Sequence, residues 1–222
     1  FIFRPLGVTL NGYVLVFQNP NIYTGYVNTI IYVIFATLLG TVLTITSGYV
    51  LSRKQLLLKN QMMFFLAFTM MFNGGMIPFY MVVRNLGMLD TRWALIIPGC
   101  VNVFNIIIMR TSMAEIPDSL EEAARIDGCG GWQLFKNILL PLLRPMVITS
   151  LVFSFSGTVK MFESAMALTK GGPGRATKSL SMYMYDVAFT YNKVGYASVI
   201  AIVIFLICVV GSLVINRFDV KD

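Results

Sequence analysis

The sequence contains no histidine among its 222 residues, and its three cysteines are widely spaced with no CxxC pair. Histidine is the commonest metal ligand and general base in proteins, so its absence argues against a metal enzyme or a histidine-dependent hydrolase. Three scattered cysteines do not suggest a disulfide framework or a structural zinc site. We therefore predict that this chain is not an enzyme, has no catalytic or metal-binding residue and holds no cofactor.

Charge is also scarce. Charged residues make up 12% of the chain, against roughly 25% in ordinary soluble domains, while 57% of the residues are hydrophobic. The net charge of +7 could indicate nucleic-acid binding, but no basic stripe interleaved with aromatic residues is present. In membrane proteins, Lys and Arg gather in the loops beside lipid headgroups. The composition therefore predicts a protein of the lipid membrane that binds no nucleic acid.

Five apolar segments are long enough to cross the hydrocarbon layer, which takes about 20 residues in a helix. They lie near residues 28–51, 61–83, 93–112, 138–167 and 195–216. Only helices or closed barrels satisfy backbone polar groups in lipid, and these segments are too long and too unalternating for barrel strands. The sequence thus predicts an all-α, polytopic membrane helix bundle with about five spanning helices, in a single transmembrane domain over residues 1–222.

Two further features concern the first half of the chain. Residues 1–18 are interpreted as an exposed stretch, without an initiator Met or a signal peptide, so we expect the chain to begin partway into a longer product. Ser, Thr and Gly along the first apolar segment predict close contacts with other helices.

The orientation in the membrane does not follow from charge alone. Placing residues 53–59, 110–144 and the tail inside gives nine of the seventeen Lys and Arg residues to the inside and eight to the outside. Because the positive-inside rule depends on an excess, this near tie favours the orientation only modestly.

The most polar stretch, residues 113–137, lies between the third and fourth apolar segments. Pro117 followed by Asp118 is a good helix start, and Glu121 and Glu122 bring negative charge to the first turn, where it complements the helix dipole. Gly128 then predicts a helix stop or sharp turn.

A second amphipathic segment follows over residues 132–140, with Trp132, Phe135, Ile138 and Leu139 at helical spacing. Helices that lie on lipid headgroups are usually basic, so the acidic end of the loop favours a protein partner instead.

This loop resembles the EAA signature of ABC importer permeases. Glu122-Ala123-Ala124, three residues, Gly128, nine residues and Ile138-Leu139-Leu140-Pro141 match every fixed position of that pattern. The extended form, with EAARIDG, Trp132 and Phe135, is similar to the carbohydrate-uptake branch. Asn28-Thr29, the external loop residues Gly171, Gly172 and Pro173, and the stretch from Tyr185 to Ala197 also resemble sugar permeases.

The resemblance implies a type I importer permease of the cell (inner) membrane, with the loop on the cytoplasmic side as a coupling helix. It implies that the ATPase-coupling residues are Glu121, Glu122, Ala123, Ala124, Asp127 and Gly128. The implied partners are a second permease subunit, two ATPase subunits that bind ATP and Mg²⁺, and an external solute-binding protein. Such permeases usually have six or more spans, so we expect at least one N-terminal helix to be missing here.

The substrate implied by the resemblance is an oligosaccharide or sugar derivative, and four polar residues in the spans are candidates for its path: Asn73, Asn102, Asn105 and Ser156. Ionisable residues in the spans are few, and Lys160 and Glu163 are spaced to pair on one helix face. Two alternatives stay open. One is an ion-coupled secondary transporter, which the lack of mid-membrane carboxylates weakens; the other is an ABC permease for a solute other than a sugar.

Overall fold

The computed structural model describes residues 11–53, 56–174 and 176–217, and these form helices and turns without a strand. The α-helices are α1 (Asn11–Gln18), α2 (Pro20–Ser52), α3 (Lys59–Met71), α4 (Met76–Asn85), α5 (Trp93–Gly99), α6 (Val103–Ala114), α7 (Asp118–Ile126), α8 (Gly131–Leu134), α9 (Leu140–Leu142), α10 (Arg144–Val159), α11 (Glu163–Leu168), α12 (Leu180–Tyr185) and α13 (Val194–Asn216). Two π-helical segments, η1 (Phe135–Leu139) and η2 (Asp186–Thr190), interrupt the set. The all-α prediction is confirmed.

Three helical stretches are long and apolar enough to cross a membrane: Ile22–Ser52, Trp93–Ala114 and Val194–Asn216. Two bent helix pairs pass the same test, α3 with α4 and the segment Gly131–Leu142 with α10, at bends of 118° and 73°. Counting each bent pair as one span gives up to 5 spans within the described residues. The predicted number of about five lies at the upper end of this range.

The predicted apolar segments differ from the helices in where they break. The segment predicted over residues 61–83 is divided after Met71, where Gly75 takes a φ of 83° that favours glycine. The segment predicted over residues 138–167 is divided at Leu143, just before Pro145 in the first turn of α10, and again after Val159. The mean hydropathy of a whole segment does not reveal such breaks, whereas Asn73-Gly74-Gly75 and Pro145, which lie at two of them, do indicate a break.

The helix α2 is the centre of the packing and contacts α5, α6, α10 and α12. It approaches the turn between α5 and α6 closely: a Cβ added at Gly40 would lie 2.7 Å from the carbonyl oxygen of Cys100. Only glycine permits this separation, which agrees with the close contacts predicted for this segment.

The exposed stretch predicted over residues 1–18 is only partly as expected. Residues 1–10 lie outside the described residues. Residues 11–18 are mostly exposed, but they form the helix α1, which packs against α13 and buries Val16. Because α1 is much shorter than a spanning helix, its apolar residues gave no span signal in the sequence.

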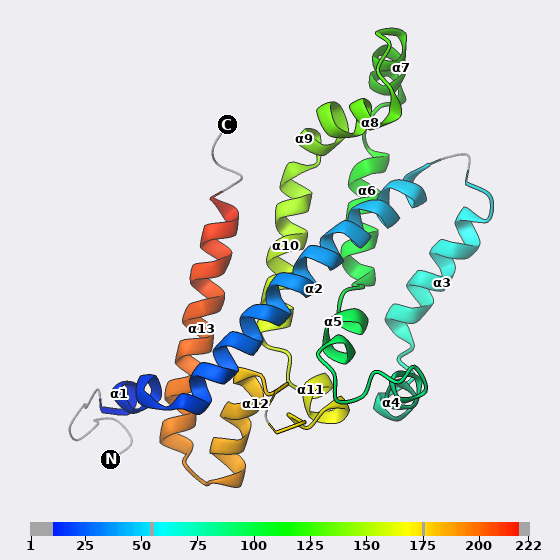
Figure 1. Cartoon of the computed structure of the whole chain (residues 1–222). Helices are drawn as coiled ribbons and strands as arrows, with labels where there is room; N and C mark the ends of the chain where they lie inside the picture. The colour runs from blue at the N-terminus through cyan, green and yellow to red at the C-terminus, as the bar shows by residue number, and fades with distance from the viewer. Residues whose placement is uncertain (1–10, 54–55, 175, 218–222) are drawn as a thin grey trace.

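Most of the long helices run between two ends of the molecule (Figure 1). One end carries α7 and is called here the α7 end. The opposite end carries α4, α11 and α12 and is called the α12 end. The helix α3 stands apart from the bundle, and none of its 13 residues, all of which are described, is buried.

Candidate functional site

The polar loop at the α7 end has the predicted helix, turn and second helical segment. The helix α7 begins at Asp118 after Pro117, which has an extended backbone, and it ends at Ile126. Gly128 has a φ of 79°, in the left-handed region that favours glycine, and so makes the turn. Local sequence signals, a capping position and a glycine, therefore determine this part of the fold.

One face of α7 points away from the protein. Ser119, Glu122, Ala123 and Ile126 are all exposed, and they are spaced as i, i+3, i+4 and i+7 along the helix. The Ile126 side chain is 85% exposed, although it is apolar. A short helix with an acidic residue and a bare isoleucine on its outward face has the composition of a surface that another protein covers.

The six residues predicted to couple to an ATPase divide into two groups. Glu122, Ala123, Asp127 and Gly128 are exposed. Ala124 is only 4% exposed and packs in a cluster with Met109, Met113 and Leu139. Glu121 also faces its own chain, through the ion pair described below. Those two residues hold α7 against the bundle instead of lying on its outward face.

The second amphipathic segment is helical, but its turns change type. It consists of α8, the π-helical η1 and α9, so the uniform spacing expected for residues 132–140 is not kept. Leu134 and Leu139 are buried, whereas Trp132 is 73% exposed and stacks on Phe135 with ring centroids 5.9 Å apart. The predicted apolar face does not include Leu134. A π-turn contains one residue more than an α-helical turn, and this changes which residues of the segment face the bundle.

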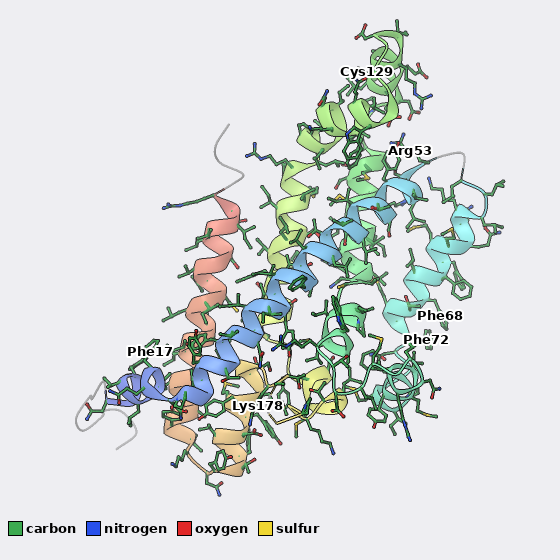
Figure 2. All side chains as sticks on the ribbon, viewed as in Figure 1. Phe17, Arg53, Phe68, Phe72, Cys129 and Lys178 are labelled. Carbon is green, nitrogen blue, oxygen red and sulfur yellow. The ribbon has the colours of Figure 1, made fainter. Side chains whose placement is uncertain are left out.

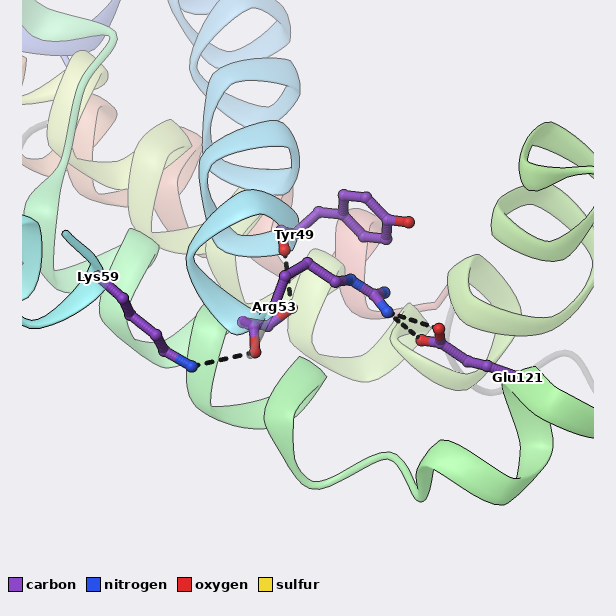
Figure 3. A network of polar contacts seen from close by, with 5 residues as sticks. Tyr49, Arg53, Lys59 and Glu121 are labelled. Carbon is purple, nitrogen blue, oxygen red and sulfur yellow. Dashed lines mark hydrogen bonds and ion pairs between the residues drawn. The ribbon is translucent and has the colours of Figure 1, made fainter. Parts of the chain in front are cut away.

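A network that the sequence did not reveal joins α7 to the end of α2 (Figure 3). Nη1 of Arg53 donates to both carboxylate oxygens of Glu121, at 2.5 Å each. The Arg53 guanidinium also lies over the Tyr49 ring, 4.1 Å from its centroid, and Tyr49 makes an edge contact with Phe135 at 6.0 Å. From the sequence alone, Arg53 is a charged loop residue, because no local pattern links it to Glu121, 68 positions later.

At the α12 end, the Gly171-Gly172-Pro173 loop is held by α2. The Thr177 hydroxyl donates to the Gly172 carbonyl oxygen at 2.6 Å, which closes the turn that contains the cis Gly172–Pro173 bond. The Tyr32 hydroxyl in turn donates to the carbonyl oxygen of Thr177 at 3.1 Å.

The residues Asn28 and Thr29 add two more bonds to this loop. Asn28 Nδ2 donates to the Lys178 carbonyl oxygen at 3.2 Å, and the backbone N–H of Leu180 donates to the Thr29 hydroxyl at 3.1 Å. Figure 2 shows Lys178 at the end of the molecule opposite to Arg53 and Cys129. The Asn28-Thr29 motif and the segment that follows Gly171-Gly172-Pro173 are far apart in the sequence, but they form one structural unit.

A cleft of about 440 Å³ lies between α6, α10 and α11. Its lining combines amide and hydroxyl groups with two aromatic rings and two opposite charges: Asn102, Ser154, Thr158, Ser164, Phe153, Phe162, Lys160 and Glu163, together with Gly99, Gly157 and Met161. Amides, hydroxyls and aromatic rings can bind a polar, ring-shaped solute.

The four predicted path residues are not all brought together in this cleft. Asn102 lines it, and Asn105 is buried behind it, where its Nδ2 donates to the Ser154 hydroxyl at 3.3 Å. Asn73 instead accepts from the backbone N–H of Gly75 at 3.0 Å, in the turn between α3 and α4. Ser156 lies on α10 but is not among the lining residues.

The expected pairing of Lys160 with Glu163 on one helix face does not occur. The helix α10 ends at Val159, and Glu163 begins a new helix, so the i, i+3 relation is lost. Both side chains line the cleft, and no ion pair joins these two described residues.

Comparison with known proteins gives a consistent result. Residues 40–221 match the family model described as "Binding-protein-dependent transport system inner membrane component". The chain is 40% identical over 153 residues to the polygalacturonan/rhamnogalacturonan transport system permease protein YtcP of Bacillus subtilis, covering 69% of this chain and 54% of that protein. It is 39% identical over 170 residues to the protein LplC of the same organism, covering 75% and 56%. The chain thus spans about half the length of the curated relatives it matches.

Solved structures of ABC transporters also match this chain. A bacterial ABC transporter involved in the import of the acidic polysaccharide alginate matches with a TM-score of 0.79 and 28% identity, over 98% of this chain and 80% of the other. A second alginate ABC transporter structure, in complex with a periplasmic protein that carries an alginate pentasaccharide, matches with a TM-score of 0.69 over 95% and 82% of the two chains. Its 16% identity supports a likeness of fold only.

Proposed function

The chain belongs to the family of binding-protein-dependent transport system inner membrane components, and we propose from this premise that it is one of two permease subunits of an ATP-driven importer. The two subunits enclose the path of the solute through the membrane. ATP and Mg²⁺ are bound by two separate ATPase subunits, and an external binding protein delivers the solute. The α7 end is then cytoplasmic, and the α12 end is external.

The observation that carries this proposal is the outward face of α7. Glu122, Ala123 and Ile126 lie exposed on a helix that projects from one end of the bundle, while Ala124 and Glu121 fix the helix from behind. A helix held this firmly and left bare on its outer side suits docking into a groove of a partner. Closure of the ATPase pair on ATP then moves α7, and the bundle changes between its inward-facing and outward-facing states.

The proposed solute is an oligosaccharide or sugar derivative. In support, one relative is a polygalacturonan/rhamnogalacturonan permease, and a multiple sugar-binding transport system permease protein, MsmF of Streptococcus mutans, is 36% identical over 46% of this chain. The cleft beside α10 adds to this, because Asn102 and Thr158 can bond hydroxyl groups while Phe153 and Phe162 can stack on a sugar ring. Of the four proposed path residues, Asn102 has the most direct structural support, because it lines the cleft.

The proposed second permease subunit is supported by the exposed aromatic residues of α3. Phe64 and Phe65 are 70% and 69% exposed, and Phe68 stacks at 4.5 Å on Phe72, just beyond the end of the helix. The helix contacts α6 of its own chain, but none of its residues is buried, so its aromatic side chains are suited to contact with lipid or with the other subunit.

The first experiment measures ATP hydrolysis by the complex of this chain with the ATPase and second permease of its own gene cluster, reconstituted in nanodiscs. We expect the solute-binding protein loaded with an oligosaccharide to stimulate hydrolysis, and Glu122→Lys to abolish the stimulation, because it reverses the charge of the docking face. Glu115→Lys is the matched control, since Glu115 is exposed but precedes α7.

Three results would contradict the proposal. If no ATPase co-purifies with the wild-type chain, the importer assignment is wrong. If Glu122→Lys stimulates like the wild type, the docking role of α7 is wrong. If a binding protein loaded with an amino acid or a peptide stimulates and a saccharide does not, the solute class is wrong.

A further inference from the structure

Among the described residues, a charged contact between Arg53 and Glu121 links the end of α2 to α7, and an aromatic ring lies against it. Arg53 lies just beyond the last residue of α2, and its Nη1 bonds both oxygens of Glu121 on α7. The Arg53 and Glu121 side chains are only 31% and 16% exposed, so the pair is partly shielded from water. One guanidinium nitrogen thus bridges both oxygens of the carboxylate, and such charge-assisted hydrogen bonds are stronger than neutral ones.

Aromatic residues also contact Arg53. The guanidinium lies against the Tyr49 ring, 4.1 Å from its centroid (Figure 3). The Tyr49 ring in turn contacts Phe135, with 6.0 Å between the ring centroids. The cation–π contact adds to the attraction that holds Arg53 in place. Arg53 therefore touches α7 through Glu121 and reaches η1 through Tyr49, so both parts of the polar loop are tied to the end of α2.

Carbonyl groups at the end of α2 accept hydrogen bonds from nearby side chains. The Ser52 hydroxyl donates to the Tyr49 carbonyl oxygen at 2.7 Å, and Lys59 Nζ donates to the Ser52 carbonyl oxygen at 3.2 Å. Carbonyl groups at a helix end lack partners within the helix, so these bonds keep the last turn of α2 from fraying. A displacement of Arg53 is thus passed to a rigid turn.

The other end of α2 holds the external loop. Asn28, Thr29 and Tyr32 bond the backbone of residues 177–180, as described above. Asn28 and Arg53 are 25 positions apart on an almost continuous helix, which at 1.5 Å per residue corresponds to about 38 Å. One rigid element therefore contacts the polar loop at one end of the protein and the Gly171-Gly172-Pro173 loop at the other.

We propose that Arg53 is the positioning residue that joins α7 to α2, so that movement of α7 is transmitted along α2 to the loop at residues 169–180. The inference rests on the proposed function, since it supposes that an ATPase moves α7. It goes beyond that function by assigning the transmission to one ion pair and one helix. Without the pair, α7 still docks, but its movement no longer displaces α2.

The test separates transmission from assembly. In the reconstituted complex, Arg53→Gln is expected to keep the co-purified ATPase and its basal hydrolysis, because Arg53 lies at the end of α2 and not on α7. Stimulation by the loaded binding protein is expected to fall about tenfold in Arg53→Gln and in Glu121→Gln, within the range of ordinary coupling between sites. Arg84→Gln is the matched control, since Arg84 is an exposed arginine on α4.

The exchanged pair Arg53→Glu with Glu121→Arg decides between transmission and a merely structural role. We expect it to recover much of the lost stimulation, because the attraction is restored with the charges reversed.

Each contrary result has a distinct meaning. Unchanged stimulation in both single variants overturns the role of Arg53 while the proposed function stands. Loss of the co-purified ATPase in the single variants, with no recovery in the exchanged pair, shows that the pair serves assembly and also overturns transmission. A wild-type chain that binds no ATPase overturns the proposed function, and this inference with it.

Discussion

At the scale of the residue, the polar loop shows how side chains adjacent in sequence take opposite tasks. Glu121 and Glu122 follow one another, yet Glu121 bonds Arg53 of the same chain and Glu122 is exposed. Ala123 and Ala124 divide in the same way, with Ala123 exposed and Ala124 buried. The helical turn of 100° per residue separates the members of each pair. The same short motif thus attaches α7 to its own chain and supplies the exposed face proposed to dock on a partner.

Gly128 gives a prediction at this scale. Its φ of 79° is strained for any residue with a Cβ and most of all for a β-branched one, at a cost of roughly 1–3 kcal/mol. We expect Gly128→Val to misplace α7 and to abolish stimulated ATP hydrolysis while the protein still inserts in the membrane.

The control for Gly128→Val is Gly130→Ala, because Gly130 has an ordinary φ of −68°. Membrane fractionation and ATPase activity of the complex give the two readouts. Equal activity in both variants would mean that the turn at Gly128 is not required.

At the scale of the element, the sequence predicted those features that local signals determine. The start of α7 at Pro117-Asp118 and its stop at Gly128 follow from backbone preferences within a few residues. The contact of Arg53 with Glu121 and that of Asn28 with Lys178 join residues 68 and 150 positions apart, and no local pattern encodes them. The π-turn of η1 also escaped prediction, since the apolar spacing over residues 132–140 was interpreted with one uniform helical period.

The contact of α2 with the turn between α5 and α6 gives a prediction at the scale of the element. A Cβ at Gly40 would meet the Cys100 carbonyl oxygen at 2.7 Å, so Gly40→Ala must push α2 and this turn apart. Overpacking of this kind costs about 1–3 kcal/mol, and we expect the thermal midpoint of the chain in detergent to fall by several degrees.

Gly195→Ala is the matched control, because a Cβ at Gly195 would meet no heavy atom within 4 Å. We expect its thermal midpoint to equal or exceed that of the wild type, since alanine favours a helix. If Gly40→Ala were as stable as this control, the close approach of α2 to the Cys100 carbonyl would not hold in the membrane.

At the scale of the whole molecule, the protein has the type I ABC importer permease fold and is a multi-pass protein of the cell membrane. Its two ends differ in construction. The α7 end presents one projecting helix, whereas the α12 end gathers the short elements α4, α11 and α12 (Figure 1). Charge counting did not establish which end faces the cytoplasm, because the Lys and Arg residues divide almost evenly between them.

The cysteines provide a direct test of this orientation. Cys129 is half-buried in the polar loop, whereas Cys100 and Cys208 are only 4% and 7% exposed. We expect a membrane-impermeant maleimide to label inside-out vesicles at Cys129 and to leave intact cells unlabelled. Cys129→Ser should remove the label. Labelling of Cys129 from outside the cell would reverse the proposed orientation.

The placement of the two tryptophans has an optical consequence. Trp132, 73% exposed on the polar loop, stands beside the proposed ATPase groove, whereas Trp93 begins α5 and packs edge-on against Phe35. Replacing one by phenylalanine leaves the other as the sole source of indole fluorescence. The chain thus carries two intrinsic reporters, one whose emission should shift when an ATPase covers the loop and one that senses the bundle itself, with no dye attached.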